Sequence, residues 1–261
     1  MSDPVLRQQL GEVVLLTLNA PALRNAISAE MREQLLGYLR EASASADCRA
    51  IILTGADGHF CSGGQLQGNN GAALVPDAER TRRSIAVLHD IVRLLSAGAK
   101  PTIAAVEGYA YGAGLSLAAA CDIVIAGEGA KFCASFGRIG LMADAGLAWS
   151  LPQRMGQARA REMLLTARVV AGQEAAAIGL VNHSVPDGGA LAAAIDMAKE
   201  FGAIAPLAIA SMKQVLAHGP NALEEVLRAE CEAQPRLAIS EDYAEGRAAF
   251  KERRRPVFRG V

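Results

Sequence analysis

The sequence has few aromatic residues and no excess of either charge. Only 4% of its 261 residues are aromatic, and 26 Lys and Arg residues nearly balance 27 Asp and Glu residues, for a net charge of −1. A surface that neutralises nucleic-acid phosphates shows a basic excess, and single-stranded nucleic acids are bound by aromatic stacking. The composition therefore argues against a nucleic-acid partner. The length, with 51% hydrophobic residues, allows a sizeable buried core.

Long apolar runs are also missing. The best candidate for a membrane span, residues 108–121, has 14 residues, is bounded by Glu107 and Asp122, and is interrupted by glycines. Crossing a bilayer takes about 20 apolar residues, so we expect this segment in a buried core and no membrane partner. The first seven residues contain no apolar signal core, and we therefore expect no secretion.

The cysteines and histidines do not have the spacing of a disulfide framework or a metal site. The five cysteines are an odd number without a Cys-x-x-Cys pair, which predicts reduced thiols in a cytoplasmic protein, with neither a disulfide framework nor a zinc site. The four histidines are scattered, and Gly-x-Gly-x-x-Gly, P-loop and Gly-x-Ser-x-Gly patterns are absent. We therefore expect no metal or redox cofactor, and neither nucleotide-dependent nor serine-hydrolase chemistry.

Strands and helices interleave early in the chain, and helices dominate later. Apolar runs at 13–18, 50–55, 101–106 and 122–126 predict strands, the first of them paired with residues near Val5. Apolar spacing predicts helices over 30–40 behind a Ser28 cap, over 80–96, and over small residues ending near 120. From about residue 146 the pattern predicts only helices: 147–154, 158–166, 173–178, 190–204, 206–218 and 222–249.

The predicted strands are apolar throughout rather than alternating, which is typical of strands buried on both faces with helices between them. The fold class is therefore α/β. We expect a core over residues 1–200 and a C-terminal helical region over 201–261, whose end (251–261) carries five basic residues against one Glu.

Two glycine-rich turns follow predicted strands. Residues 59–66 read His-Phe-Cys-Ser-Gly-Gly-Gln-Leu, and residues 107–114 read Glu-Gly-Tyr-Ala-Tyr-Gly-Ala-Gly. Glycine lets the backbone approach a ligand, and N–H groups that open a helix are unpaired. Either turn by itself is typical of an ordinary connection between a strand and the next element, without a role in binding. Together they could direct two N–H donors at one oxygen, which is an oxyanion hole.

Seven segments spread over the chain match one known family: Pro21–Ala26, Phe60–Leu66, Lys100–Gly114, Cys121–Ala126, Phe132, Ile139–Leu141 and Ala175–Val181. In these the sequence resembles the enoyl-CoA hydratase/isomerase (crotonase) superfamily. The resemblance implies a spiral core of ββα units and a C-terminal helical region that builds homotrimers, or homohexamers as dimers of trimers. It also implies acyl-CoA thioester substrates, with CoA as part of the substrate rather than a cofactor.

The resemblance also assigns site residues by position. The backbone N–H groups of Gly64 and Ala113 match the two oxyanion-hole donors of the family. Residues implied to contact the substrate are Ala22, Arg24, Ser62, Gln65, Leu66, Phe136, Phe250 and Lys251. For Phe250 and Lys251, the alternative to a contact with CoA is that the basic C-terminal end is simply exposed to solvent.

Three positions separate this chain from the hydratases of the family. Those carry two glutamates where this chain has Ser116 and Phe136, neither of which can move a proton at neutral pH. A carboxylate stands instead at Asp144, as in members resembling 1,2-epoxyphenylacetyl-CoA isomerase, dienoyl-CoA isomerase and 4-chlorobenzoyl-CoA dehalogenase. Because Asp144 precedes the predicted helix 147–154, an N-cap is the alternative role, and the two roles can coexist.

These positions favour an acyl-CoA isomerase in which Asp144 is the acid and base and the two N–H groups stabilise an enolate. One alternative is a hydrolytic aroyl-CoA dehalogenase with Asp144 as nucleophile and His89 as base, although such members use tryptophan where this chain has Phe136. His89 lies at the edge of an apolar helical stripe, where a structural role is the other interpretation. A further alternative is a non-catalytic acyl-CoA-binding or RNA-binding scaffold.

Overall fold

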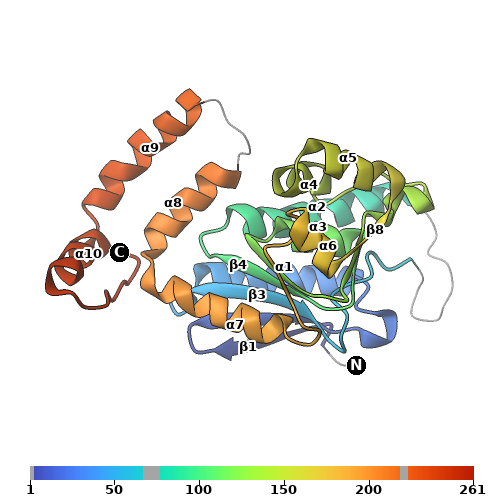
Figure 1. The fold of residues 1–261 in the computed structure, drawn as a ribbon, viewed down its shortest axis with the longest axis horizontal. Coiled ribbons are helices and arrows are strands. Elements are labelled where there is room, and N and C mark those ends of the chain that lie inside the picture. The colour runs from blue at the N-terminus through green and yellow to red at the C-terminus, as the bar shows by residue number, and fades with distance from the viewer. Residues whose placement is uncertain (1–2, 67–76, 218–222) are drawn as a thin grey trace.

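The computed structural model describes residues 3–66, 77–217 and 223–261 (Figure 1). Its centre is a six-stranded sheet, ordered β1 (Val5–Leu10), β2 (Val13–Leu18), β3 (Ala50–Gly55), β4 (Thr102–Val106), β6 (Ile123–Gly127) and β9 (His183–Val185). β1 and β2 are antiparallel, and every later neighbouring pair is parallel. A smaller sheet contains β5 (Tyr109–Tyr111), β7 (Lys131–Cys133) and β8 (Val169–Ala171).

Helices connect these strands and form the C-terminal end. They are η1 (Pro21–Leu23), α1 (Ala29–Ala44), α2 (Ala78–Ala97), α3 (Ala113–Ala120), η2 (Ser135–Ile139), α4 (Leu147–Met155), α5 (Gln157–Thr166), α6 (Gly172–Ala177), α7 (Ala190–Glu200), η3 (Phe201–Ala203), α8 (Pro206–Ala217), α9 (Leu223–Ala238) and α10 (Glu241–Glu252). None of the helices in the described ranges is both long and apolar enough to cross a membrane.

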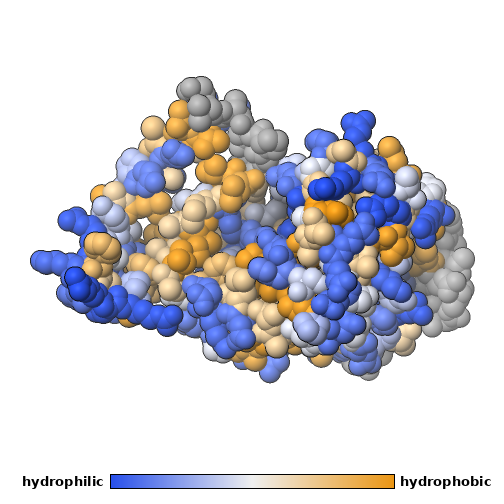
Figure 2. Space-filling model, in the orientation of Figure 1, coloured by the Kyte–Doolittle hydropathy of each residue, from blue (hydrophilic) through white to orange (hydrophobic). Residues whose placement is uncertain are grey.

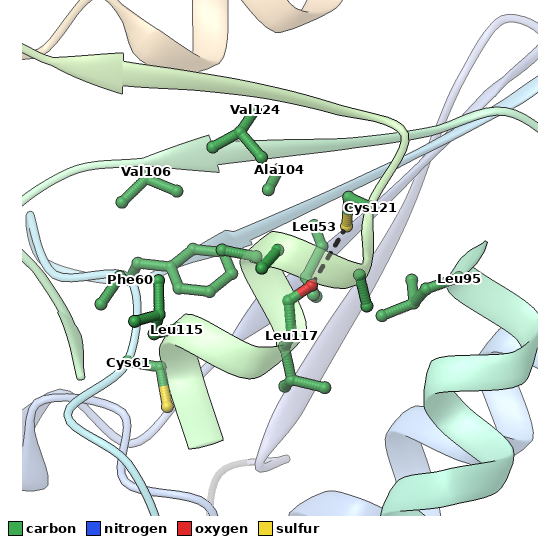
Figure 3. Packing of buried hydrophobic residues seen from close by; sticks show 14 of the residues in the cluster. Leu53, Phe60, Cys61, Leu95, Ala104, Val106, Leu115, Leu117, Cys121 and Val124 are labelled. Carbon is green, nitrogen blue, oxygen red and sulfur yellow. Dashed lines mark hydrogen bonds between the residues drawn. The ribbon is translucent and has the colours of Figure 1, made fainter. Parts of the chain in front are cut away.

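The main sheet is buried on both faces at β2, β3, β4 and β6, which confirms the interpretation of the apolar strands. Alternate residues of β2 and β3, such as Leu16 and Leu53, pack in a large cluster with α1, α2 and α3. Their neighbours Leu15 and Ile52 pack on the opposite face against small residues of α7. Figure 3 shows Phe60 within the large cluster, between α3 and the sheet.

The early elements are where the sequence predicts them. α1 begins behind Ser28, whose side chain accepts a hydrogen bond from the Met31 N–H at 3.0 Å. Strands 13–18 and 50–55 match β2 and β3. The five cysteines are free, in line with the prediction of reduced thiols.

Two predictions about the second half are wrong. The chain after residue 146 is not entirely helical, because it contains β8 and β9. Earlier in the chain, β5 and β7 are two further strands that the sequence does not predict. Each of these four strands has three residues, too few for an alternating pattern to show. The single helix predicted over 222–249 is two helices, since Ser240 caps α10 through the Tyr243 N–H. Residue 222 and predicted helix end 218 lie outside the described residues.

Candidate active site

The first glycine-rich turn leaves one backbone N–H without a partner. Ile27 pairs with this turn as a parallel bridge, donating to the Gly63 carbonyl at 2.8 Å and accepting from the Gln65 N–H at 3.1 Å. In such a bridge the N–H of the intervening residue, Gly64, points to the other side. Within the described part of the chain it has no acceptor. A Cβ at Gly64 would meet no atom of the described residues within 4 Å, so the described part of the chain leaves this side of Gly64 open.

The second turn ends at the start of α3. Its N-cap, Gly112, has φ +51° and ψ −123° and offers no side-chain acceptor to the helix. As the first residue of α3, Ala113 has no intrahelical acceptor for its N–H. The positive end of the helix dipole adds to the attraction for an anion there.

The fold brings the two turns together. Gly63 has φ +110°, and a Cβ on it would lie 3.1 Å from the Tyr111 carbonyl oxygen and 3.9 Å from the Ala113 nitrogen. Between them lies Cys61, whose backbone bonds both ways with β5 and whose Sγ accepts from the Gly63 N–H at 3.4 Å. Burial raises the pKa of Cys61 to about 12, so the sulfur is a neutral acceptor. The predicted donors Gly64 and Ala113 are thus neighbours.

Gly114 sets the distance between the two turns. A Cβ there would lie 2.4 Å from the Cys61 carbonyl oxygen, and Figure 3 shows Cys61 beside the first turn of α3. Gly114→Ala must therefore push α3 away. We expect kcat to fall about 10- to 100-fold, since a displacement of about 1 Å has effects of this size. Gly37→Ala is the matched control, because a Cβ on this helical glycine meets nothing within 4 Å. Equal activity of the two variants in steady-state assays would contradict the assignment.

Asp144 lies in a fixed turn before α4. Its carbonyl accepts hydrogen bonds from the Ser116 hydroxyl at 3.0 Å and from the Leu147 N–H at 3.1 Å. The next residue, the buried Ala145, has φ +46°, a conformation that non-glycine residues rarely adopt. The N-cap of α4 is Gly146, without a side-chain hydrogen bond. The capping interpretation of Asp144 is therefore wrong, and its carboxylate is left for another role.

The Asp144 carboxylate is half-buried and poorly hydrogen-bonded. Its Oδ1 is buried and has no partner in the described residues. Burial raises the pKa of Asp144, and the nearby charges of His89 and Arg32 partly offset this effect. A carboxylate with a raised pKa is a better base than an ordinary aspartate.

A depression of about 410 Å³ follows one face of α2 and ends at His89. Its other lining residues are Ala78, Thr81, Arg82, Ile85 and Ala86. Because these positions recur at helical spacing, the depression runs along the axis of α2. His89 is exposed on this face, and its role in catalysis stays a prediction. The charge of His89 lowers the pKa of Asp144, opposing the larger effect of burial.

The residues predicted to contact CoA near the first turn are grouped. The Ser62 N–H donates to the Arg24 carbonyl at 3.0 Å, and the Ser62 hydroxyl to the Leu23 carbonyl at 3.0 Å. The Arg24 guanidinium lies 5.2 Å from the centre of the Tyr109 ring. Ala22 and Leu66 are exposed, Gln65 is half-buried, and the buried Phe136 ring would lie 4.0 Å from a Cβ on Gly112.

Phe250 and Lys251 are not part of this group within one chain. They lie on α10, which is well separated from α2 and α3 in Figure 1. Phe250 is 88% exposed, and Arg254 in the basic end is neutralised by ion pairs with Glu245 and Glu252. A contact of these residues with substrate would need a second copy of the chain, and trimer formation stays a prediction.

The sequence model of one family, described as "Enoyl-CoA hydratase/isomerase", matches residues 8–261. The chain belongs to this family. It is 38% identical over 269 residues to a probable enoyl-CoA hydratase of Rhodobacter capsulatus, with all of both chains covered. It is 33% identical over 261 residues to the 1,2-epoxyphenylacetyl-CoA isomerase of Escherichia coli, again over all of both chains.

The fold agrees with this assignment. The crystal structure of an enoyl-CoA hydratase from Bacillus anthracis superposes with a TM-score of 0.91 at 30% identity, covering 99% of this chain and 100% of that one. The protein is therefore an enzyme of the enoyl-CoA hydratase/isomerase family with the crotonase fold, and it processes acyl-CoA thioesters.

Two features of the site were not predicted from the sequence. The sequence marks Ser116 only as a position without the glutamate of a hydratase, whereas its buried hydroxyl fixes the Asp144 turn. The second is Arg32 of α1, whose charge lowers the pKa of Asp144. No local pattern marks it, because Arg32 belongs to the polar side of an ordinary amphipathic helix.

Proposed function

We propose that this enzyme is an acyl-CoA isomerase. The observation that carries the proposal is the half-buried Asp144 carboxylate. Among the described residues, one of its oxygens has no hydrogen-bond partner, and the N–H groups of Gly64 and Ala113 have no acceptor. A site with one such carboxylate suits a reaction in which a proton leaves one carbon and returns to another. That reaction shifts a double bond or opens a strained ring without net addition of water.

The proposed steps assign each group one task. The thioester oxygen accepts hydrogen bonds from the N–H groups of Gly64 and Ala113. Asp144 takes a proton from the acyl chain, and the electron pair left behind forms an enolate, whose oxygen the two donors stabilise. One such donor typically lowers a barrier by about 2.7–4 kcal/mol. The protonated Asp144 then returns the proton to a different carbon, which restores the carboxylate.

Ser116 supports isomerisation over simple hydration. Its hydroxyl is buried and bonded to backbone carbonyls, those of Asp144 at 3.0 Å and Gly112 at 3.3 Å. The aromatic ring of Phe136 has no exchangeable proton. The two positions where the resemblance places the glutamates of a hydratase therefore offer no group that activates water.

A 3-enoyl-CoA of medium chain length tests the proposal in deuterated water. We expect the enzyme to form the conjugated 2-enoyl thioester and to place solvent deuterium in the acyl chain, because the carboxyl proton of Asp144 exchanges with solvent. Absorbance of the conjugated thioester and mass spectrometry of the product measure the two effects. An enzyme that hydrates the 2-enoyl thioester but neither isomerises nor exchanges the 3-enoyl form would overturn the proposal.

His89 favours a second candidate, hydrolytic dehalogenation of an aroyl-CoA. In that reaction an Asp144 oxygen bonds to the ring carbon and halide leaves. His89 then takes a proton from the water that cleaves the resulting ester. The exposure of His89 on the α2 face and the effect of its charge on Asp144 fit this arrangement. Single-turnover mass spectrometry with a halobenzoyl-CoA distinguishes the candidates, because only the dehalogenase accumulates an ester on Asp144.

A further inference from the structure

The guanidinium of Arg154, in the last turn of α4, joins three segments of the chain. Its Nε and Nη2 donate to three carbonyls at the end of α3, those of Ala119 at 2.9 Å, Cys121, and Asp122 at 3.4 Å. Its Nη1 donates to the Leu180 carbonyl at 3.5 Å and to the side-chain oxygen of Asn182 at 3.3 Å. A guanidinium has five N–H groups, and these five hydrogen bonds match that number.

The acceptors of Arg154 are all neutral. The Asp122 carboxylate is bound by Lys213 instead, and the described residues give Arg154 no ion pair. The last carbonyls of a helix have no intrahelical partners and carry the negative end of its dipole. Arg154 therefore holds the C-terminal end of α3, where a cation is favoured, rather than a single acidic side chain.

α3 and α4 lie side by side and run in the same direction. At their beginnings, the Ser116 hydroxyl of α3 donates to the carbonyl of Asp144, just before α4, at 3.0 Å. At their ends, Arg154 of α4 binds the last carbonyls of α3. α3 reads Ala-Gly-Leu-Ser-Leu-Ala-Ala-Ala and is buried throughout, so its small side chains let α4 pack closely. Both helices therefore begin at the site, α3 with the Ala113 N–H and α4 directly after the Asp144 turn.

Two neighbouring helices with the same direction place equal ends of their dipoles together, which is unfavourable unless another charge compensates. The cation of Arg154 compensates the two negative ends. The two positive ends face the site, where the proposed enolate carries negative charge. α4 is thus held against α3 by Ser116 at one end and by Arg154 at the other, about 13 Å away, which is the length of nine helical residues.

We infer that Arg154 is a positioning residue, which keeps α4 aligned with α3 so that Asp144 stays at the right distance from the acyl chain. The inference rests on the proposed role of Asp144 as the base. Arg154 itself touches neither substrate nor base, since it lies at the opposite end of both helices. Without Arg154, only the Ser116 contact of these two remains, and α4 can tilt about it, which turns the Asp144 carboxylate away from the acyl chain.

Arg154→Met tests the inference, because methionine keeps an apolar stem but forms none of the five hydrogen bonds. We expect kcat to fall about 10-fold, since a displacement of about 1 Å can cost about 100-fold. The Kd for a CoA thioester should stay within a few-fold, because α3 keeps its contact between Gly114 and Cys61. Trp149, the only tryptophan of the chain, lies in α4 and is 37% exposed. Quenching of its fluorescence by acrylamide should become stronger as α4 loosens.

Matched variants keep the test decisive. Arg154→Lys retains the charge but has only three N–H donors, so we expect kcat to fall about threefold, with a smaller change in quenching. Arg159→Met removes an exposed arginine that donates to the Ile178 carbonyl at 3.5 Å, and both quantities should stay at their wild-type values. Wild-type kcat and quenching in either folded Arg154 variant overturn the inference, as does a lower kcat with unchanged quenching.

Circular dichroism and urea unfolding establish which variants are folded, and Arg154→Lys decides alone if Arg154→Met does not fold. The quenching measurement needs no turnover. It therefore tests the position of α4 even if full activity of Asp144→Asn overturns the proposed function.

Discussion

Asp144→Asn is expected to lower kcat by about 10²- to 10⁴-fold, the usual contribution of a general acid–base group. Asparagine fills the same volume but cannot take a proton from the acyl chain. The backbone N–H groups of Gly64 and Ala113 are unchanged, so the Kd for a CoA thioester should stay within a few-fold of the wild-type value. Steady-state kinetics and titration calorimetry measure the two quantities.

The matched control is Asp90→Asn, which removes an exposed, ion-paired carboxylate of α2. Its kcat should stay within about twofold of wild type, since exposed ion pairs contribute little. Full activity of Asp144→Asn would end the proposal that this residue is the acid and base. Equal losses in both variants would indicate a general structural effect instead.

Asp144→Asn should also make the protein more stable at neutral pH. Burial raises the pKa of Asp144 above its ordinary value, so the folded state binds this proton more tightly than the unfolded state. The resulting contribution to stability is present below the unfolded pKa and is lost as the pH rises through the folded pKa. Asparagine does not ionise, so its advantage should appear at pH 7 and disappear near pH 3, below the ordinary pKa of aspartate. Urea unfolding at both pH values measures it.

Lys213→Met is expected to destabilise the protein by about 3 kcal/mol, the low end of the cost of breaking a buried ion pair, because Lys213 is buried whereas the Asp122 side chain is 28% exposed. The Lys213 ammonium of α8 bonds Asp122 and donates to the Leu95 carbonyl at 2.9 Å, near the end of α2. Its side chain is 5% exposed. Without it, Asp122 keeps its bond from the Thr102 N–H at 2.7 Å but loses its cation. The melting temperature should fall by about 6–12 °C.

Lys199→Met is the matched control, because Lys199 pairs with Asp196 at 2.7 Å on the exposed surface of α7. We expect a cost below about 1 kcal/mol there. Asp122→Asn combined with Lys213→Met should cost less than the sum of the single substitutions, since the two groups interact directly. If Lys213→Met and Lys199→Met had the same melting temperature, the pair of Lys213 and Asp122 would not anchor α8 on the core.

The element pattern of the first half follows from local rules. Continuous apolar runs predict β2, β3 and β4 because these strands are buried on both faces, by α7 on one side and by α1, α2 and α3 on the other. The short strands β5, β7, β8 and β9 could not be predicted in this way. Each forms only because a partner strand distant in sequence offers hydrogen bonds. The break between α9 and α10 depends on the Ser240 cap, a single residue within a continuous amphipathic pattern.

The sequence by itself determined the family, the α/β class and the two glycine-rich turns, since these depend on residue types at fixed local spacing. It also places Ser116 and Phe136 at the two positions where the resemblance puts the glutamates of a hydratase, which is why we propose isomerisation. Only the tertiary structure decided that the two turns meet at Gly63 and Ala113, and that Asp144 is a half-buried carboxylate rather than a helix cap.

Arg32 illustrates why the neighbours of a group can be known only from the tertiary structure. The effect of one charge on another depends on their distance and on the water around them, and neither is encoded in the spacing of α1. Phe250 and Lys251 are the opposite case. Their positions in the family suggest the substrate site, whereas the fold of one chain places them on α10, away from that site. Sequence spacing thus identified the chemical groups, and long-range packing decided which of them share a site.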